Sequence, residues 1–287
     1  MLALTSDFNG TSRNSSDIRK NLEKIAGAGF SHVHWSHEWN TAYQYSVYEM
    51  LQIREWCGEF GLAVKGIHAC SGENNCDLKD YTSANDYNRL AGVELIKNRI
   101  DLAHCLNAGA IVLHLYLPQR HQFEKEKDRE LFLRPVLKSF NELESYCKTR
   151  QIKICLENNF ENSLEHSCYL YDTLFNKYDG DFLGFCFDTG HALMACGENC
   201  LEYARRYNSR LFMIHVHDNQ GIYDEHLVPF AGKFYWDDFA PVLASSPYQF
   251  PVLIESAFRE KGDESAWLKK AFETGSRFLA MVEKLRQ

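Results

Sequence analysis

The 287-residue sequence lacks the features that mark a membrane or exported protein. No stretch approaches the roughly 20 consecutive apolar residues that span a bilayer. The first eight residues lack the basic segment and the longer apolar run of a signal peptide, and they are typical of a first strand. We therefore expect a cytoplasmic protein with no membrane partner.

Paired cysteines, concentrated positive charge and linkers are also missing. The ten cysteines include no C-x-x-C pair and lie mostly in apolar segments, so we expect buried free thiols. The formal net charge is −8, and the densest charge run, residues 124–130, mixes both signs, which disfavours a nucleic-acid partner. No Pro/Gly/Ser-rich tract interrupts the chain, so we expect one domain over residues 1–287.

What the sequence does contain is an alternation of short apolar runs with longer segments of helical period, which is typical of repeated βα units. The predicted strands lie near residues 2–7, 31–35, 63–68, 110–116, 152–157, 183–187, 211–217 and 250–255. The predicted helices include 17–28, 43–60, 85–107, 128–149, 165–177, 198–207 and 265–285. Eight units in a chain of this length predict an α/β fold, the (β/α)8 TIM barrel.

A doubly wound open sheet is the competing fold. That fold would favour a glycine-rich phosphate turn after the first strand, and residues 7–10 (Asp-Phe-Asn-Gly) are not one. Several strands also form nearly continuous apolar runs, as expected when both faces of a strand are covered. The barrel is therefore favoured.

Polar residues that can bind metal fall at the end of one predicted strand after another. In a barrel such positions converge on one mouth. Carboxylate oxygens and imidazole nitrogens together suit a divalent ion such as Mn²⁺, Zn²⁺, Co²⁺ or Mg²⁺, and the absence of cysteine argues against a closed structural zinc site. The residues are His68, His114, Glu157, Asp188, His191, His217 and Glu255.

Each of these segments also has a plainer interpretation. A lone histidine at a strand end is usually structural, Glu157 could begin a solvated loop, and Asp188 could simply cap a helix. The pair Asp224 and His226 has the spacing of further ligands, although charged loop residues are more often solvated. Glu255 closes an apolar run, where a carboxylate is costly without a counter-charge.

The seventh strand carries two histidines, His215 and His217. Period-two alternation places both on the same side of the strand, where they are costly unless ligated or hydrogen-bonded. His217 lies nearer the strand end and is the stronger candidate ligand.

Five motifs resemble the xylose isomerase-like TIM barrel superfamily, and the similarity covers nearly the whole chain. They are Leu156–Asn158, Phe187–His191, His215–Asn219, Asp224–Leu227 and Ile254–Ser256. The superfamily includes sugar and sugar-phosphate isomerases and epimerases, keto-polyol dehydratases of the inosose and dehydroshikimate type, and metal-dependent AP endonucleases. The resemblance implies an enzyme that uses a divalent metal.

Carried over by motif, four residues correspond to the metal quartet of the keto-sugar epimerases: Glu157, Asp188, His217 and Glu255. Glu157 and Glu255 would also be the acid/base pair. His191 would contact substrate or a further ion. Four more residues fall where the AP endonucleases hold the remaining ligands of a three-zinc cluster: His68, His114, Asp224 and His226.

The resemblance favours a small-molecule sugar or sugar-phosphate substrate, turned over through a metal-stabilised enediolate. A keto-polyol dehydratase, a three-zinc AP endonuclease and a non-catalytic sugar-binding protein are the alternatives. The nuclease is disfavoured because basic groups for gripping phosphodiesters are not evident. The segment after His217 lacks the arginine expected of ketohexose 3-epimerases, which disfavours free-ketose 3-epimerisation.

Two further sets of residues concern the substrate pocket. Trp35 and Trp39 follow the second strand and are expected to wall the pocket, with ordinary barrel–helix packing as the alternative. Four basic residues near the predicted mouth could hold a substrate phosphate, although none lies in a motif: Lys65, Arg120, Lys233 and Arg259. Barrels of this family often associate, so a homo-oligomer stays open.

Overall fold

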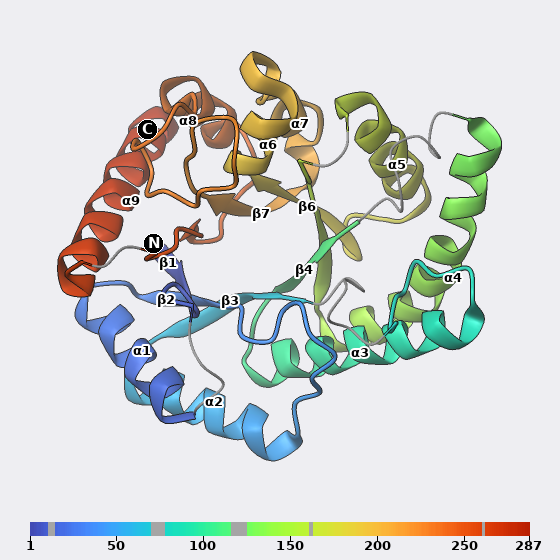
Figure 1. The fold of residues 1–287 in the computed structure, drawn as a ribbon, viewed down its shortest axis with the longest axis horizontal. Coiled ribbons are helices and arrows are strands. Elements are labelled where there is room, and N and C mark those ends of the chain that lie inside the picture. The colour runs from blue at the N-terminus through green and yellow to red at the C-terminus, as the bar shows by residue number, and fades with distance from the viewer. Residues whose placement is uncertain (11–14, 70–77, 116–124, 161–162, 260–261) are drawn as a thin grey trace.

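Eight parallel strands form a closed barrel in the computed structural model, which describes residues 1–10, 15–69, 78–115, 125–160, 163–259 and 262–287. The strands pair in chain order, and β1 pairs with both β2 and β8, which closes the sheet (Figure 1). This confirms the predicted (β/α)8 barrel and excludes the open sheet. The strands are β1 Leu2–Thr5, β2 His32–Trp35, β3 Ala63–His68, β4 Ala110–His114, β5 Lys153–Glu157, β6 Leu183–Asp188, β7 Leu211–Val216 and β8 Val252–Ile254.

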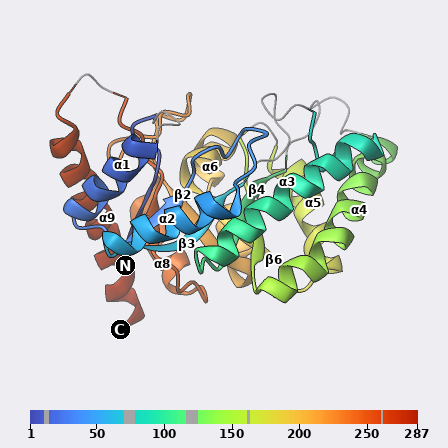
Figure 2. The same ribbon diagram turned by 90° about the horizontal axis from the view of Figure 1, so that it is seen from below.

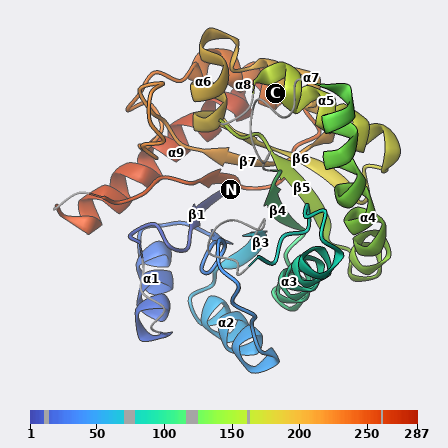
Figure 3. The same ribbon diagram turned by 45° about the vertical axis from the view of Figure 1, so that its right-hand side comes forward.

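Helices surround the strands, as Figures 1 and 3 show. The longer ones confirm the predicted segments: α1 Ser15–Gly27, α2 Val47–Glu59, α3 Asp86–Cys105, α4 Glu126–Arg150, α5 Leu164–Lys177 and α9 Glu264–Arg286. In the side view of Figure 2, α1, α2 and α3 lie in sequence along one flank of the barrel. Within the described residues, no helix combines the length and the hydropathy that a bilayer span requires.

The connections around β6, β7 and β8 differ from the sequence expectation. The predicted helix 198–207 is interrupted: it consists of a 3-10 turn, η2 Gly197–Asn199, and a short helix, α7 Glu202–Arg206. The short helix α8 Trp236–Ala244 was not predicted, and α6 Thr189–Cys196 was foreseen only in the alternative interpretation of Asp188 as a helix cap. A second 3-10 turn, η3 Asn208–Arg210, precedes β7. Helices of eight or nine residues offer too few turns for a clear helical period.

Alternation along the strands separates two buried layers. Ile111 and Leu113 belong to the large core between strands and helices, whereas Ala110 and Val112 pack inside the barrel with Cys155, Cys186 and Met213. Because side chains alternate in a strand, the next inward positions fall at the strand ends. Those positions are His114, Glu157, Asp188, His215 and His217.

The prediction of free thiols is confirmed for the residues that the structure describes, and the predicted burial holds for all of these cysteines except the half-buried Cys105 and Cys196. Eight of the ten cysteines lie in these residues, and all eight are free thiols. Cys155 and Cys186 fill the inner layer beneath the polar strand ends. Burial raises the pKa of the Cys155 thiol to about 12, so it remains a neutral packing group.

Candidate functional site

Glu157, at the end of β5, lies at the centre of a buried cluster of imidazoles. His114 Nε2 lies 3.1 Å from Glu157 Oε2, and His68 Nε2 lies 3.6 Å from the same oxygen. On the other oxygen, His215 Nδ1 lies at 3.0 Å and His191 Nδ1 at 3.5 Å. Residues from β3, β4, β7 and α6 therefore converge on one carboxylate, as closure of the barrel requires.

The electrostatics of this cluster follow from its burial. Burial alone raises the pKa of Glu157, but His215 and His114 lower it well below the ordinary value. Burial lowers the pKa of His191, whereas Asp188, Asp224 and Glu157 raise it well above the usual range. The carboxylate is therefore ionised, and its charge is balanced by protons on neighbouring imidazoles.

Asp188 forms a second group with His191 and His217. Its side chain caps the N-terminus of α6 by accepting the backbone N–H of His191 at 2.6 Å. The same carboxylate faces His217, whose Nε2 lies 3.0 Å from both oxygens. Asp188 therefore caps the helix, as the plainer interpretation held, and also faces His217.

Gly190 permits this close approach between α6 and β7. A Cβ built on Gly190 would collide with three atoms of the His217 imidazole. His217 is fully buried and its backbone N–H donates to Thr189 Oγ1 at 3.0 Å, so it has little room to move. The glycine is therefore required by the position of the imidazole.

The loop pair Asp224 and His226 joins the cluster. Asp224 Oδ2 lies 2.9 Å from His226 Nε2 and 3.6 Å from His191 Nε2, and Asp224 Oδ1 lies 3.8 Å from His217 Nε2. The His226 ring stacks on the His217 ring at a centroid distance of 4.1 Å. An antiparallel bridge between Asp218 and Leu227 pins this loop against the end of β7.

Glu255 follows β8 and approaches the cluster through His215. Glu255 Oε2 lies 2.5 Å from His215 Nδ1, the nitrogen that also contacts Glu157. The Glu255 backbone carbonyl accepts from His226 Nδ1 at 2.6 Å. Glu157 and Asp188 in turn share His191. The predicted quartet is thus linked through shared imidazoles, and His215 has a more central place than the sequence indicated.

The donor set fits divalent metal. Five of the groups that could hold an ion are His68–His114–Glu157, Asp188–His191–His217, His217–Asp224–His226, His68–His215–Glu255 and Glu157–Cys186–His215, each with its ligand atoms within 4.8 Å of one another. His217 Nδ1 and Asp224 Oδ1 are buried without a hydrogen-bond partner among the described residues, which is costly unless a ligand binds them. Carboxylate and imidazole donors suit Mn²⁺, Zn²⁺ or Co²⁺.

Several supporting residues could not be assigned from sequence. Asn158 holds Asp188 through both backbone groups, at 2.9 and 2.8 Å, and the Tyr171 hydroxyl donates to the Glu157 carbonyl at 2.6 Å. His34 on β2 lies beneath the cluster, with its ring centroid 5.0 Å from that of His215. Its inward register on β2 is the one sequence signal that could have identified it.

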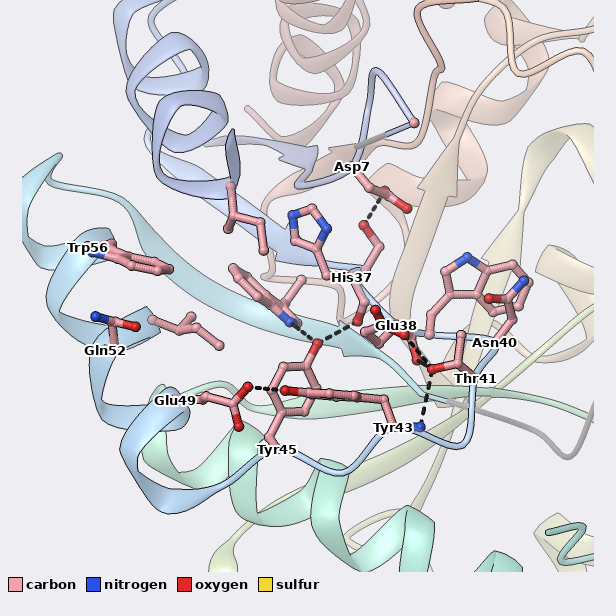
Figure 4. A pocket seen from close by; sticks show the side chains of 16 residues that line it. Asp7, His37, Glu38, Asn40, Thr41, Tyr43, Tyr45, Glu49, Gln52 and Trp56 are labelled. Atoms are coloured by element: carbon pink, nitrogen blue, oxygen red, sulfur yellow. Dashed lines mark hydrogen bonds between the residues drawn. The ribbon is translucent and has the colours of Figure 1, made fainter. Parts of the chain in front are cut away.

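The predicted pocket residues have different environments. Trp39 lies beside the cluster, with its ring centroid 4.5 Å from that of His68, and both Trp39 and the buried Trp35 line a cavity between α1 and α2 (Figure 4). Arg259 is exposed and donates to the Asp224 carbonyl at 3.3 Å. Lys233 is also exposed, Lys65 lines a separate cavity with residues of α2, and Arg120 lies outside the described residues.

Known proteins share this sequence pattern and this fold. The sequence matches the family described as "Xylose isomerase-like TIM barrel" over residues 22–279. It is 33% identical over 285 residues to the uncharacterized protein y4fM of Sinorhizobium fredii, covering 94% of this chain and 91% of that protein. The fold is similar to that of a D-tagatose 3-epimerase-like protein (TM-score 0.74, 21% identity, 99% of this chain and 98% of that chain). It is also similar to that of an L-ribulose 3-epimerase (TM-score 0.75, 15% identity, 99% and 95%). The chain therefore belongs to the xylose isomerase-like TIM barrel family.

Proposed function

We propose that this protein is a divalent-metal-dependent isomerase or epimerase that moves a proton on a sugar. The observation that carries the proposal is the meeting of two carboxylates at one imidazole: His215 Nδ1 lies 3.0 Å from Glu157 and 2.5 Å from Glu255. Glu157 is fully buried, and the Glu255 side chain is 13% exposed. Two carboxylates in one pocket can take and return a proton from different sides of a substrate.

Four residues are proposed to hold the ion: Glu157, Asp188, His217 and Glu255. The similar folds described above are those of a D-tagatose 3-epimerase-like protein and an L-ribulose 3-epimerase, which supports a sugar substrate. A bound divalent ion supplies Lewis-acid chemistry, since it polarises a carbonyl and offsets negative charge that develops on the substrate oxygens. The remaining steps belong to the side chains of the chain itself.

In the proposed reaction, one glutamate removes the proton from the carbon beside the substrate carbonyl, leaving an enediolate of the sugar. The other glutamate returns a proton to the opposite face, which gives an epimer, or to the neighbouring carbon, which gives an isomer. His215 orients both carboxylates through its contacts with them. Burial of Glu157 excludes water from the proton that is being transferred.

The test is incubation of metal-loaded protein with a panel of keto-sugars and keto-sugar phosphates in D₂O, followed by NMR. Deuterium beside the carbonyl, seen only with metal, is the expected result. Glu157→Gln and Glu255→Gln should each reduce exchange to below a few per cent while metal content is checked in parallel. More than that residual exchange in both variants, with metal bound, would contradict the acid/base assignment. Loss of water from the sugar would instead identify a dehydratase.

A second candidate, a three-metal phosphodiesterase of the AP endonuclease type, is favoured by the extra ligands. His68, His114, His191, Asp224 and His226 all lie within the same cluster as the proposed quartet. Metal analysis separates the two candidates. Three tightly held Zn²⁺ ions, nicking of abasic-site DNA and no deuterium exchange would favour the phosphodiesterase, whereas one exchangeable ion with exchange favours the sugar enzyme.

A further inference from the structure

A cavity of about 380 Å³ lies beside the metal-ligand cluster, between α1, α2 and the β2–α2 connection (Figure 4). Its volume falls in the range of small-molecule sites, about 300–1,000 Å³. Resting on the proposed function, we propose that this cavity is a glycosyl subsite. It holds an uncharged sugar ring that is joined to the ring or chain reacting at the cluster, so the substrate is a glycosylated keto-sugar.

Trp39 lies between the cavity and the cluster. Its indole lines the cavity, and its ring centroid lies 4.5 Å from that of His68 and 5.5 Å from that of His114. Asp7, which follows β1 at the barrel mouth, lines the cavity from the other side. A substrate with its reacting carbons near Glu157 therefore meets the cavity directly across one side chain.

The cavity lining has the chemistry that sugar rings require. Its aromatic side chains offer flat apolar faces for sugar C–H groups: they are Trp35, Trp39, Tyr43, Tyr45 and Trp56. Asn40 and Gln52 also line the cavity with half-buried amides, which lie at opposite sides of the view in Figure 4, and neither makes a hydrogen bond to another described residue. Each amide can donate to one ring hydroxyl and accept from another.

The charge of the described lining disfavours a phosphate in this cavity. Three carboxylates line it, those of Asp7, Glu38 and Glu49, and the described lining contains neither lysine nor arginine. The guanidinium of Arg99 packs behind Tyr45 at 4.9 Å from the ring centroid and donates to the Glu38 carbonyl, outside the lining. Phosphate sites use arginine, lysine or open helix N-termini, so the fitting ligand is a neutral ring.

The rear wall is held in place before any ligand binds. Trp35 Nε1 donates to the Tyr45 hydroxyl at 2.9 Å, and that hydroxyl donates to the His37 carbonyl at 2.6 Å. The Asn98 side chain bonds both backbone groups of Tyr45, at 2.8 and 2.9 Å. A preformed wall lowers the entropy cost of binding, which is useful for a non-reacting part of the substrate.

Binding is tested first, with a ligand that cannot react. Methyl glucoside should give saturation-transfer NMR signals with metal-loaded protein, and glucose 6-phosphate should give none from this cavity. Gln52→Ala and Asn40→Ala should each weaken methyl glucoside about tenfold, the effect of one lost hydrogen bond. Leu51→Ala is the matched control, because Leu51 is an exposed neighbour on α2 outside the lining. Unchanged affinity in both amide variants would overturn the subsite.

Turnover is tested second, by deuterium exchange into a glucosyl-ketose and into the same ketose without the glucosyl group. Wild-type kcat/KM should be higher for the glucosyl-ketose, and Gln52→Ala should lower it about tenfold more for this substrate than for the free ketose. Exchange into a free ketose without glycoside binding would overturn the subsite and leave the proposed function standing. Glycoside binding without exchange into any sugar would overturn the proposed function and leave the sugar-binding cavity standing.

Discussion

Replacing Gly190 by alanine tests whether the buried cluster binds metal through His217. The added methyl group would collide with the fully buried His217 imidazole, and the surrounding helix and strand leave no space for the ring. Alanine favours a helix by up to about 1 kcal/mol over glycine, but overpacking a buried site costs about 1–3 kcal/mol. The cost of overpacking therefore exceeds the gain in helix propensity, and metal-free Gly190→Ala should unfold at a lower temperature than the wild type.

The effect on metal should be larger than the effect on stability. Displacing one ligand or its support typically costs about 10–100-fold in metal affinity, so calorimetric titration of Gly190→Ala with Mn²⁺ or Zn²⁺ should show a loss of that size. Gly27→Ala is the control, since a methyl group on Gly27 of α1 meets no atom within 4 Å. Wild-type metal affinity in a folded Gly190→Ala protein would refute the placement of His217 among the ligands.

Three further predictions concern metal, pH and the surface. Adding metal at 100 times its Kd should stabilise the chelator-treated protein by about 2.7 kcal/mol, and an unchanged Tm would contradict a resident ion. Burial lowers the pKa of His226, but Asp224 raises it to about 9, so at pH 7 an ion held by the His217–Asp224–His226 group must displace its proton. Metal affinity should therefore increase as the pH rises toward about 9 and decrease as the pH falls from that value. The released proton should make the calorimetric binding heat depend on the buffer, and buffer-independent heats would count against this. Arg259→Ala should change kcat/KM for a sugar phosphate less than about threefold, because Arg259 is exposed; a tenfold loss would identify it as a phosphate contact.

The strands and their polar ends could be predicted because both follow from local sequence. Continuous apolar runs mark strands covered on both faces, and the first polar residue after such a run marks the barrel mouth. The place of His215 could not be predicted in this way. It depends on the closing of β5, β7 and β8 around one point and on a register shift between Phe185 and Cys186, which sets how β6 pairs with β7. The cavity between α1 and α2 depends likewise on helix packing, which a single sequence does not encode locally.

Charge links the number of bound ions to the class of substrate. The cluster contains four carboxylates, on Glu157, Asp188, Asp224 and Glu255, with a combined charge of −4 when ionised. Counting the carboxylates and the ions alone, one divalent ion gives a total of −2 and three give +2, and each imidazole that keeps its proton beside a carboxylate makes the total less negative. Beside a cavity lined by carboxylates, the more negative one-ion site disfavours phosphate and accepts a neutral sugar, whereas the more positive three-ion site attracts a phosphodiester. Metal stoichiometry and substrate charge must therefore agree, and a single ion found together with a preference for phosphorylated substrates would contradict this electrostatic account.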